Sequence, residues 1–111
     1  MQFVFFVCVE PPFKVDDPEA LHRDTSAWVE EMEGRGVLKG GDRLRPAADA
    51  ATVRIRNNER IVRDGPFAET KEKIAGYDII ECADRNEAVE IASKHPMAKL
   101  GTIEVRPVWP L

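Results

Sequence analysis

The feature that most constrains the fold is the run Phe3 to Val9, in which every residue is aromatic, β-branched or cysteine. Successive side chains of a β-strand point to opposite faces, so both faces of this strand are apolar. Each apolar face has to be covered by another layer, and we therefore expect this strand at the centre of its sheet. The strand ends at Pro11 and Pro12, because proline cannot donate to a central ladder.

Capping signals and helical spacing predict two helices. Asp17 before Pro18 is typical of a helix start, and the apolar face that follows has helical spacing. A second helix is predicted to begin at Asp84, which with Glu87 resembles a capping box, and to end before Pro96. The two apolar stripes are Leu21, Thr25, Trp28, Val29 and Met32 on the first helix, and Ala88, Ile91, Ala92 and His95 on the second.

The remaining apolar or alternating segments are predicted strands. They begin at residue 37 and span residues 52–56, 60–63, 76–82 and 102–106. Gly40 and Gly41 indicate a bulge or a close backbone approach in the first of these strands. Asn57 and Asn58 tolerate positive φ, so the second and third strands are predicted to form a hairpin with one wet face.

The order of these elements is strand, helix, strand, inserted hairpin, strand, helix, strand. This is the split β-α-β pattern of a ferredoxin-like α+β fold, and residues 1–111 form a single domain. Two helices cover only one face of such a sheet, whereas the first strand needs cover on both. We therefore expect a homodimer that packs sheet against sheet, with a ligand pocket inside the interface or under the helices.

The composition narrows the class of function. Hydrophobic residues make up 43% of the 111 residues and the net charge is −4, with acids and bases interleaved, which disfavours direct binding to nucleic acid. The apolar run at the start is too short for a membrane span and lacks the basic flank of a signal peptide. Cys8 and Cys82 are predicted to be buried thiols, so a cytoplasmic protein without membrane contact is expected.

The segment from Arg63 to Tyr77 carries the most specific signal, and it begins with Asp64-Gly65-Pro66-Phe67. Pro66 fixes its own φ and removes a donor, so Asp64 lies at a sharply defined exit from a strand. Phe67 is predicted to fill the core beneath that turn. The charged residues Glu69, Lys71 and Glu72 follow within one short stretch.

This segment resembles the signature of bacterial YCII-related proteins of the DGPF type. The matching residues run from Asp64 to Glu72 and continue at Gly76-Tyr77. Further matches are Gly36-Val37-Leu38, residues 40–46, Thr52-Val53-Arg54 and residues 104–107. The resemblance implies a dimeric α+β barrel. In the broader family, a His–Asp pair in a pocket has been proposed as catalytic. Some relatives resemble dechlorinating lyases, and some DGPF domains accompany sigma factors.

Asp64 and His95 are the candidate catalytic residues. A carboxylate on a rigid turn can act as a general base, although such a residue more often accepts backbone N–H groups and locks the turn. The two roles are compatible. His95 lies at a helix C-terminus, where the dipole favours the protonated imidazole, and could be its acid–base partner. The alternative for His95 is a side chain that hydrogen-bonds the last helical carbonyls. His22 lies off the apolar stripe and is expected to be exposed.

Glu69, Lys71, Glu72 and Tyr77 are the candidate substrate-binding residues. The three charged residues could arrange a small polar or anionic molecule, or could form a solvated, mutually paired run. The Tyr77 hydroxyl could reach a pocket, although a packing aromatic is more common. No metal site and no cofactor are expected, because no ligand spacing, phosphate loop or dinucleotide fingerprint is present in the sequence.

These observations favour a cofactor-independent enzyme that transfers a proton on a small molecule, of lyase, isomerase or hydrolase type. The alternative is a non-catalytic ligand-binding or regulatory module, such as a partner of a sigma factor in trans. The two differ in whether Asp64 and a histidine converge on an enclosed cavity.

Overall fold

The computed structural model describes residues 1–67 and 71–110. Its strands are β1 (Gln2–Val9), β2 (Leu38–Arg43), β3 (Ala51–Arg56), β4 (Glu59–Asp64), β5 (Lys73–Glu81) and β6 (Thr102–Pro107). Its helices are α1 (Pro18–Gly34), α2 (Arg85–Ser93) and the short α3 (Met97–Leu100), with a single 3-10 turn at Ala47–Asp49. No helix in these ranges is long and apolar enough to cross a membrane.

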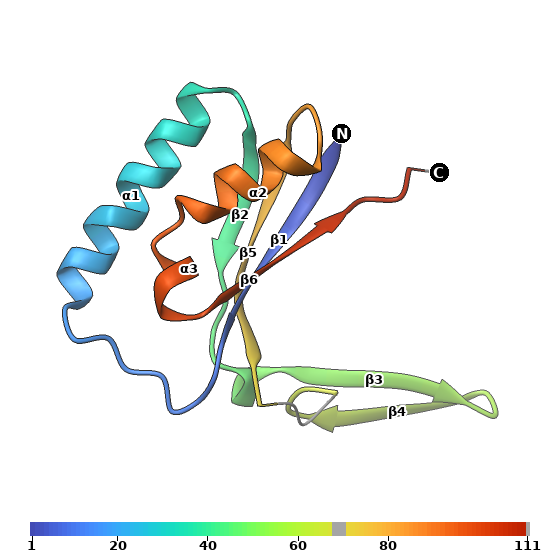
Figure 1. Ribbon diagram of the computed structural model, residues 1–111. Coiled ribbons are helices and arrows are strands. Elements are labelled where there is room, and N and C mark those ends of the chain that lie inside the picture. The colour runs from blue at the N-terminus through green and yellow to red at the C-terminus, as the bar shows by residue number, and fades with distance from the viewer. Residues whose placement is uncertain (68–70, 111) are drawn as a thin grey trace.

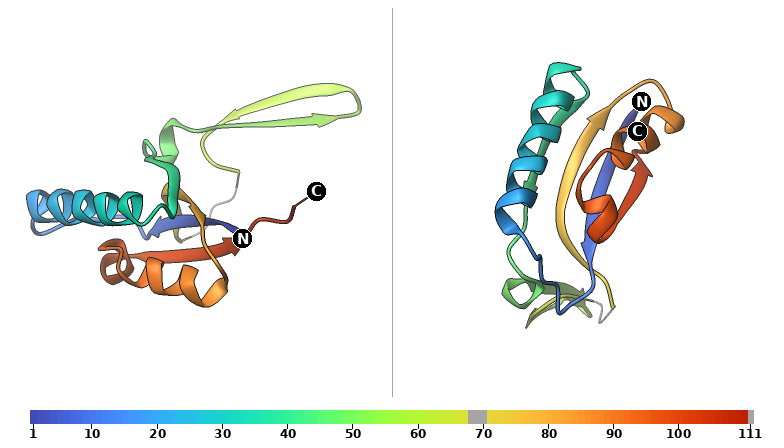
Figure 2. Two further views of the ribbon diagram at one scale, coloured as in Figure 1. Left: turned by 90° about the horizontal axis from the view of Figure 1, so that it is seen from above. Right: turned by 60° about the vertical axis from the view of Figure 1, so that its left-hand side comes forward.

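Four strands form the main sheet in the order β2-β5-β1-β6, and all neighbouring pairs are antiparallel. The strand β1 is central, as its two apolar faces predict. The helices α1 and α2 lie on one side of this sheet (Figures 1 and 2). The chain is therefore an α+β protein whose strand order is compatible with a ferredoxin-like fold.

The core lies between the main sheet and the two longer helices. Phe3 and Phe5 on β1 point into it and are fully buried, together with Met32, Ile80 and Ile91. Trp28 on α1 donates its indole N–H to the carbonyl oxygen of Ile91 on α2 over 3.0 Å, and so ties the two helices together. The expected helix stripes thus meet in one apolar layer.

The predicted caps are confirmed by hydrogen bonds. The Asp17 side chain accepts from the backbone N–H of Ala20, and the Asp84 side chain accepts from that of Glu87. Glu87 completes the capping box by accepting from the backbone N–H of Ala83. One element was not expected: α3 follows Pro96 directly, whereas the sequence pattern predicts only a helix end there.

The opposite face of the main sheet, here called the open face, carries the residues that alternate with the buried ones. In β1 these are Val4, Phe6 and Cys8, and the register pairs Val4 with Ile79 and Phe6 with Tyr77 on β5. All five side chains are only partly buried. None of the helices described covers this face (Figure 2).

The hairpin β3–β4, residues 51–64, is here called the arm. It forms a separate two-stranded sheet and projects from the main body on the side away from α1 (Figures 1 and 2). Asn57 and Asn58 turn it with φ of 52° and 62°, as the sequence predicts. The prediction that Phe67 fills the core is wrong: its side chain is 70% exposed and lies under the guanidinium of Arg54, 4.5 Å from the ring centroid.

Candidate functional site

A groove of about 900 Å³ runs between α1, the main sheet and the end of α2. Its walls are mostly apolar, from Val7 and Val9 on β1 to Leu21 and Val29 on α1. Its polar lining includes Asp78 and His95. The partly enclosed, largely apolar shape with a few polar groups is typical of a small-molecule site.

Asp78 enters the groove because of its register in β5. It pairs with Phe5 on β1 and with Gly41 on β2, which places it on the helix-facing side of the sheet. Gly41 has φ of +151°, and a Cβ there would lie 2.6 Å from an Asp78 carboxylate oxygen and 2.4 Å from the Tyr77 carbonyl oxygen. Only glycine lets the β2 backbone approach this carboxylate so closely.

His95 lies between α2 and α3, with only 6% of its side chain exposed. Its ring contacts the Trp28 ring edge-on, with centroids 4.5 Å apart. Its Nδ1 accepts a hydrogen bond of 3.0 Å from the backbone N–H of Met97. Because Nδ1 accepts, the proton of the neutral ring is on Nε2.

The Nε2 atom of His95 faces the carboxylate of Asp78, with 4.0 Å between Nε2 and Oδ2. Burial raises the pKa of Asp78 to about 6 and lowers the pKa of His95 to about 4. At neutral pH the groove therefore holds an ionised carboxylate opposite a neutral imidazole. The sequence pattern predicts that the dipole of the preceding helix favours protonated His95, whereas in the structure loss of solvent around the ring lowers its pKa.

This arrangement suits proton transfer. A carboxylate with a pKa close to the working pH is an effective general base, and an imidazole N–H can donate to a ligand oxygen. The 4.0 Å separation is longer than a hydrogen bond, so Asp78 and His95 are not hydrogen-bonded to each other. Both groups can therefore form hydrogen bonds to the same ligand.

Of the six predicted site residues, the structure brings the His95 side chain to this groove. Tyr77 also borders the groove, but its register with Phe6 places its side chain on the open face. Asp64, Lys71 and Glu72 are exposed and do not line the groove. Glu72 instead accepts a hydrogen bond from the Thr102 hydroxyl. Glu69 lies outside the described residues.

Asp64 ends the arm, and the turn after it is held by backbone and threonine contacts. The Gly65 N–H donates to the Ala50 carbonyl over 2.7 Å, and the Thr52 hydroxyl donates to the Gly65 carbonyl over 2.9 Å. Gly65 has φ of +95°. A residue before proline usually adopts an extended conformation, but glycine can adopt this positive φ. Within residues 1–67 and 71–110, no hydrogen bond or ion pair joins Asp64 to His95.

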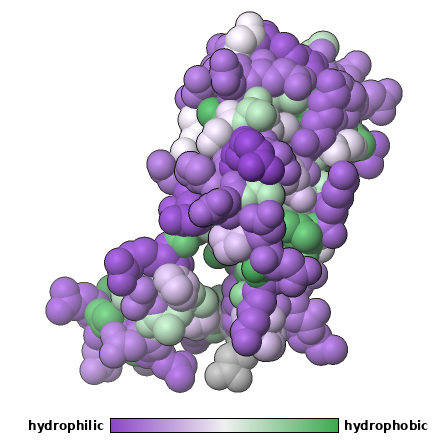
Figure 3. All heavy atoms as spheres, turned by 90° about the vertical axis from the view of Figure 1, so that its left-hand side faces the viewer, coloured by the Kyte–Doolittle hydropathy of each residue, from purple (hydrophilic) through white to green (hydrophobic). Residues whose placement is uncertain are grey.

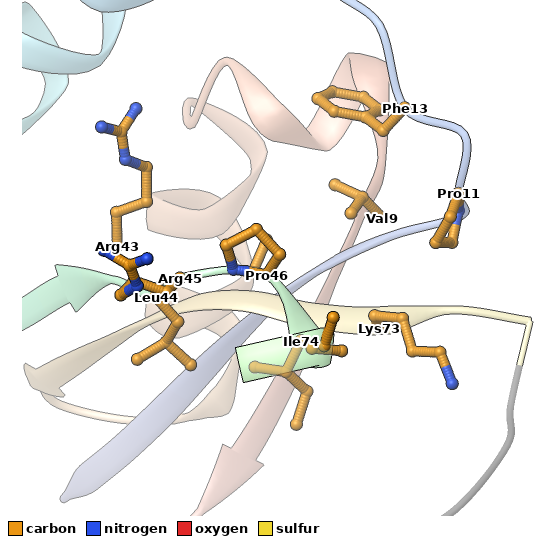
Figure 4. Close-up of a pocket in the computed structure, with 12 residues that line it drawn as sticks. Val9, Pro11, Phe13, Arg43, Leu44, Arg45, Pro46, Lys73 and Ile74 are labelled. Carbon is orange, nitrogen blue, oxygen red and sulfur yellow. The ribbon is translucent and has the colours of Figure 1, made fainter. Parts of the chain in front are cut away.

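A second hollow of about 840 Å³ adjoins the groove and shares Val9, Phe13 and Arg43 with it. Phe13 and Val9 line one side, opposite Pro46 and Leu44 (Figure 4). Its charged lining is cationic: Arg43, Arg45 and Lys73. Arg45 already pairs with Asp49 at 3.1 Å.

Among the described residues, no group of three or more histidine, cysteine, aspartate or glutamate side chains could hold a metal ion. His22 is exposed, as expected, but it lies on the rim of the groove. Both cysteines are free thiols, and Cys82 is buried while Cys8 is partly exposed on the open face.

Sequence reasoning missed Asp78. The available signal was alternation within the predicted strand 76–82, where Asp78 shares a face with the apolar Ile80. Since Ile80 had to face the core, an acid two residues before it had to be partly desolvated, and such acids concentrate at functional sites.

The fold and the groove define a small α+β domain in which a buried histidine faces a partly buried aspartate. A family model for the YCII-related domain matches residues 1–111. An uncharacterized protein of Rhizobium meliloti (strain 1021) is 41% identical over 95 residues, which cover 84% of this chain and 77% of the relative. The chain belongs to the YCII-related family, as the sequence motifs predict.

Proposed function

We propose that the chain is a cofactor-independent enzyme that transfers a proton on a small molecule bound in the α1 groove. Asp78 is the general base and the Nε2–H group of His95 hydrogen-bonds the ligand. The reaction is of the lyase, isomerase or hydrolase type. The observation that carries the proposal is the pair itself: a buried imidazole and a partly buried carboxylate 4.0 Å apart on the wall of a groove.

The lining of the groove supports a ligand with an apolar body. Val7, Leu21 and Val29 would contact that body, while a carbonyl or hydroxyl group would meet the pair. Arg43 is the cation that would receive an anionic group, since it lines both the groove and the cationic hollow beside it.

Two further proposals follow from the sequence motifs and the open face. The chain is a DGPF-type member of its family that acts in the cytoplasm, which its two free thiols support. Two copies pack open face to open face as a dimeric α+β barrel, which would cover Val4, Phe6 and Ile79.

A substrate-independent assay tests the catalytic proposal. The protein is incubated in D2O with a soluble small-molecule extract of bacterial cells, and mass spectrometry records which compounds gain deuterium or change in abundance. The wild type changes at least one compound. Asp78→Asn slows that change by about 100-fold or more, because the base is lost.

Asp64→Asn is the matched control, since it removes one carboxylate charge at an exposed position. It should keep the activity. Activity lost in Asp64→Asn and kept in Asp78→Asn would move the base to Asp64. A compound that binds the wild type without any change would favour the non-catalytic binding module instead.

A further inference from the structure

The two faces of the arm differ in chemistry. The β3–β4 register places Val53 opposite Val62 and Ile55 opposite Arg60, so Val53, Ile55 and Val62 share one face. Their exposed fractions are 61%, 56% and 53%. The other face carries Arg54, Arg56 and Arg63, and there Arg54 packs on Phe67.

The apolar face has no cover within the chain described. The arm forms its own sheet and stands apart from the main body, with hydrophobic side chains among the hydrophilic ones (Figure 3). A two-stranded hairpin alone is marginally stable in water, and three half-exposed β-branched side chains on one face are typical of a contact surface.

The distribution of net charge indicates what covers the apolar face of the arm. The arm contains four arginines and two acids, a net charge of +2, and because the whole chain carries −4 the remainder carries −6. On the open face, Glu104 is paired with Arg106, whose guanidinium lies over the Phe6 ring. A second copy of this chain therefore offers an uncovered apolar sheet face, on a body whose net charge is opposite to that of the arm. Arg60 is the one arginine of the arm on the apolar face.

We propose that the arm of each chain closes over the body of a second copy with its apolar face inward. The arm projects on the side of the sheet away from α1, the side of the open face, so a copy docked there lies within its reach (Figures 1 and 2). A two-fold axis makes the contact reciprocal, and each body receives one arm. This inference rests on the proposed sheet-to-sheet dimer.

The test makes the apolar face of the arm polar with threonine, which keeps the side chains β-branched. The triple variant Val53→Thr, Ile55→Thr, Val62→Thr is compared with Ile61→Thr on the other face of the same arm. Sedimentation velocity over a concentration series should show the dimer of the triple variant weakened by about tenfold or more, and that of the control unchanged. A triple variant that dimerises as tightly as the wild type would overturn the inference.

A sheet variant, Phe6→Glu, separates the two proposals. If Phe6→Glu weakens the dimer and the triple variant does not, the sheet-to-sheet dimer stands and the arm contact is wrong. A wild type that is monomeric at micromolar concentration would overturn both.

Hydrogen exchange of the unmodified chain gives a reading that needs no variant. Amides of residues 53–62 should exchange more slowly at concentrations where the chain is dimeric. Exchange in the arm that is the same in monomer and dimer would contradict the proposed contact.

Discussion

Asp78 and His95 respond to the same burial in opposite directions. Loss of solvent penalises the charged form of each group, so the pKa of Asp78 rises from its ordinary 3.8 to about 6 while that of His95 falls from 6.5 to about 4. The Asp78 contribution to stability is present below pH 3.8 and is lost as the pH rises through 6. The His95 contribution is present above pH 6.5 and is lost as the pH falls through 4. In the wild type, the effects of Asp78 and His95 on the pH dependence of the unfolding free energy therefore oppose each other.

Replacing either Asp78 or His95 should reveal how the other residue makes the unfolding free energy depend on pH. Between pH 6.5 and pH 4, Asp78→Asn should lose on the order of 2 kcal/mol of unfolding free energy relative to the wild type, because buried His95 must then gain a proton unopposed. His95→Asn should gain a similar amount over that interval. Urea unfolding at several pH values measures both, and two variants whose curves run parallel to the wild type would refute the assignment.

Single residues were also the hardest part to predict from the sequence. The position of His95 on a buried stripe was predictable, since helical spacing alone defines it. Its neutral state was not, because that depends on Trp28 and on the sheet packed against the ring. Phe67 failed for a similar reason: whether an aromatic residue fills a core depends on where the arm projects, and no local pattern encodes that direction.

At the scale of elements, the bulge in β2 connects the backbone to the site. The register shifts between Leu38 and Gly40, and Gly41 then passes next to Asp78. The Gly40-Gly41 pair predicted a close approach, and the structure identifies the neighbour as the carboxylate of the site.

Gly41→Ala should therefore be costly. A Cβ at this position meets Asp78 and Tyr77 and also forces a left-handed φ, so we expect a loss of about 2 kcal/mol or more of unfolding free energy. Gly40→Ala is the control, because its nearest neighbour would be the Ile79 Cδ1 atom at 4.0 Å. Equal urea midpoints for the two variants would show that the close approach is not required.

Elements with local signals were predicted well. Asp17, Asp84 and the Asn57-Asn58 turn all act within a few residues of sequence, and each was confirmed. The strand β5 begins at Lys73, earlier than predicted, because its first residues pair with β1 and not because of their own alternation. The helix α3 is four residues long and has no apolar period to detect.

At the scale of the whole molecule, the two apolar faces of β1 explain both the position of this strand at the centre of the sheet and the presence of an uncovered apolar face. One face of β1 is buried under the helices, while Val4 and Phe6 on the other remain partly exposed. The sequence predicted the inserted hairpin but not that it would stand away from the body as an arm. Whether the hairpin packs on the body depends on its tertiary contacts, and alternation of polar and apolar residues within a strand does not predict those contacts.

The groove is also a property of the whole molecule, because α1, the main sheet and the end of α2 must meet to bury the pair. At neutral pH the groove holds an ionised Asp78 opposite a neutral His95 with its proton on Nε2. The chain has only two histidines, so the two rings can be told apart in a ¹⁵N NMR titration.

In that titration the His95 ring should keep its Nε2–H form from pH 7 down to about pH 5 and gain a proton with a midpoint near pH 4. A His95 midpoint at or above pH 6.5, or a neutral ring protonated on Nδ1, would contradict the account.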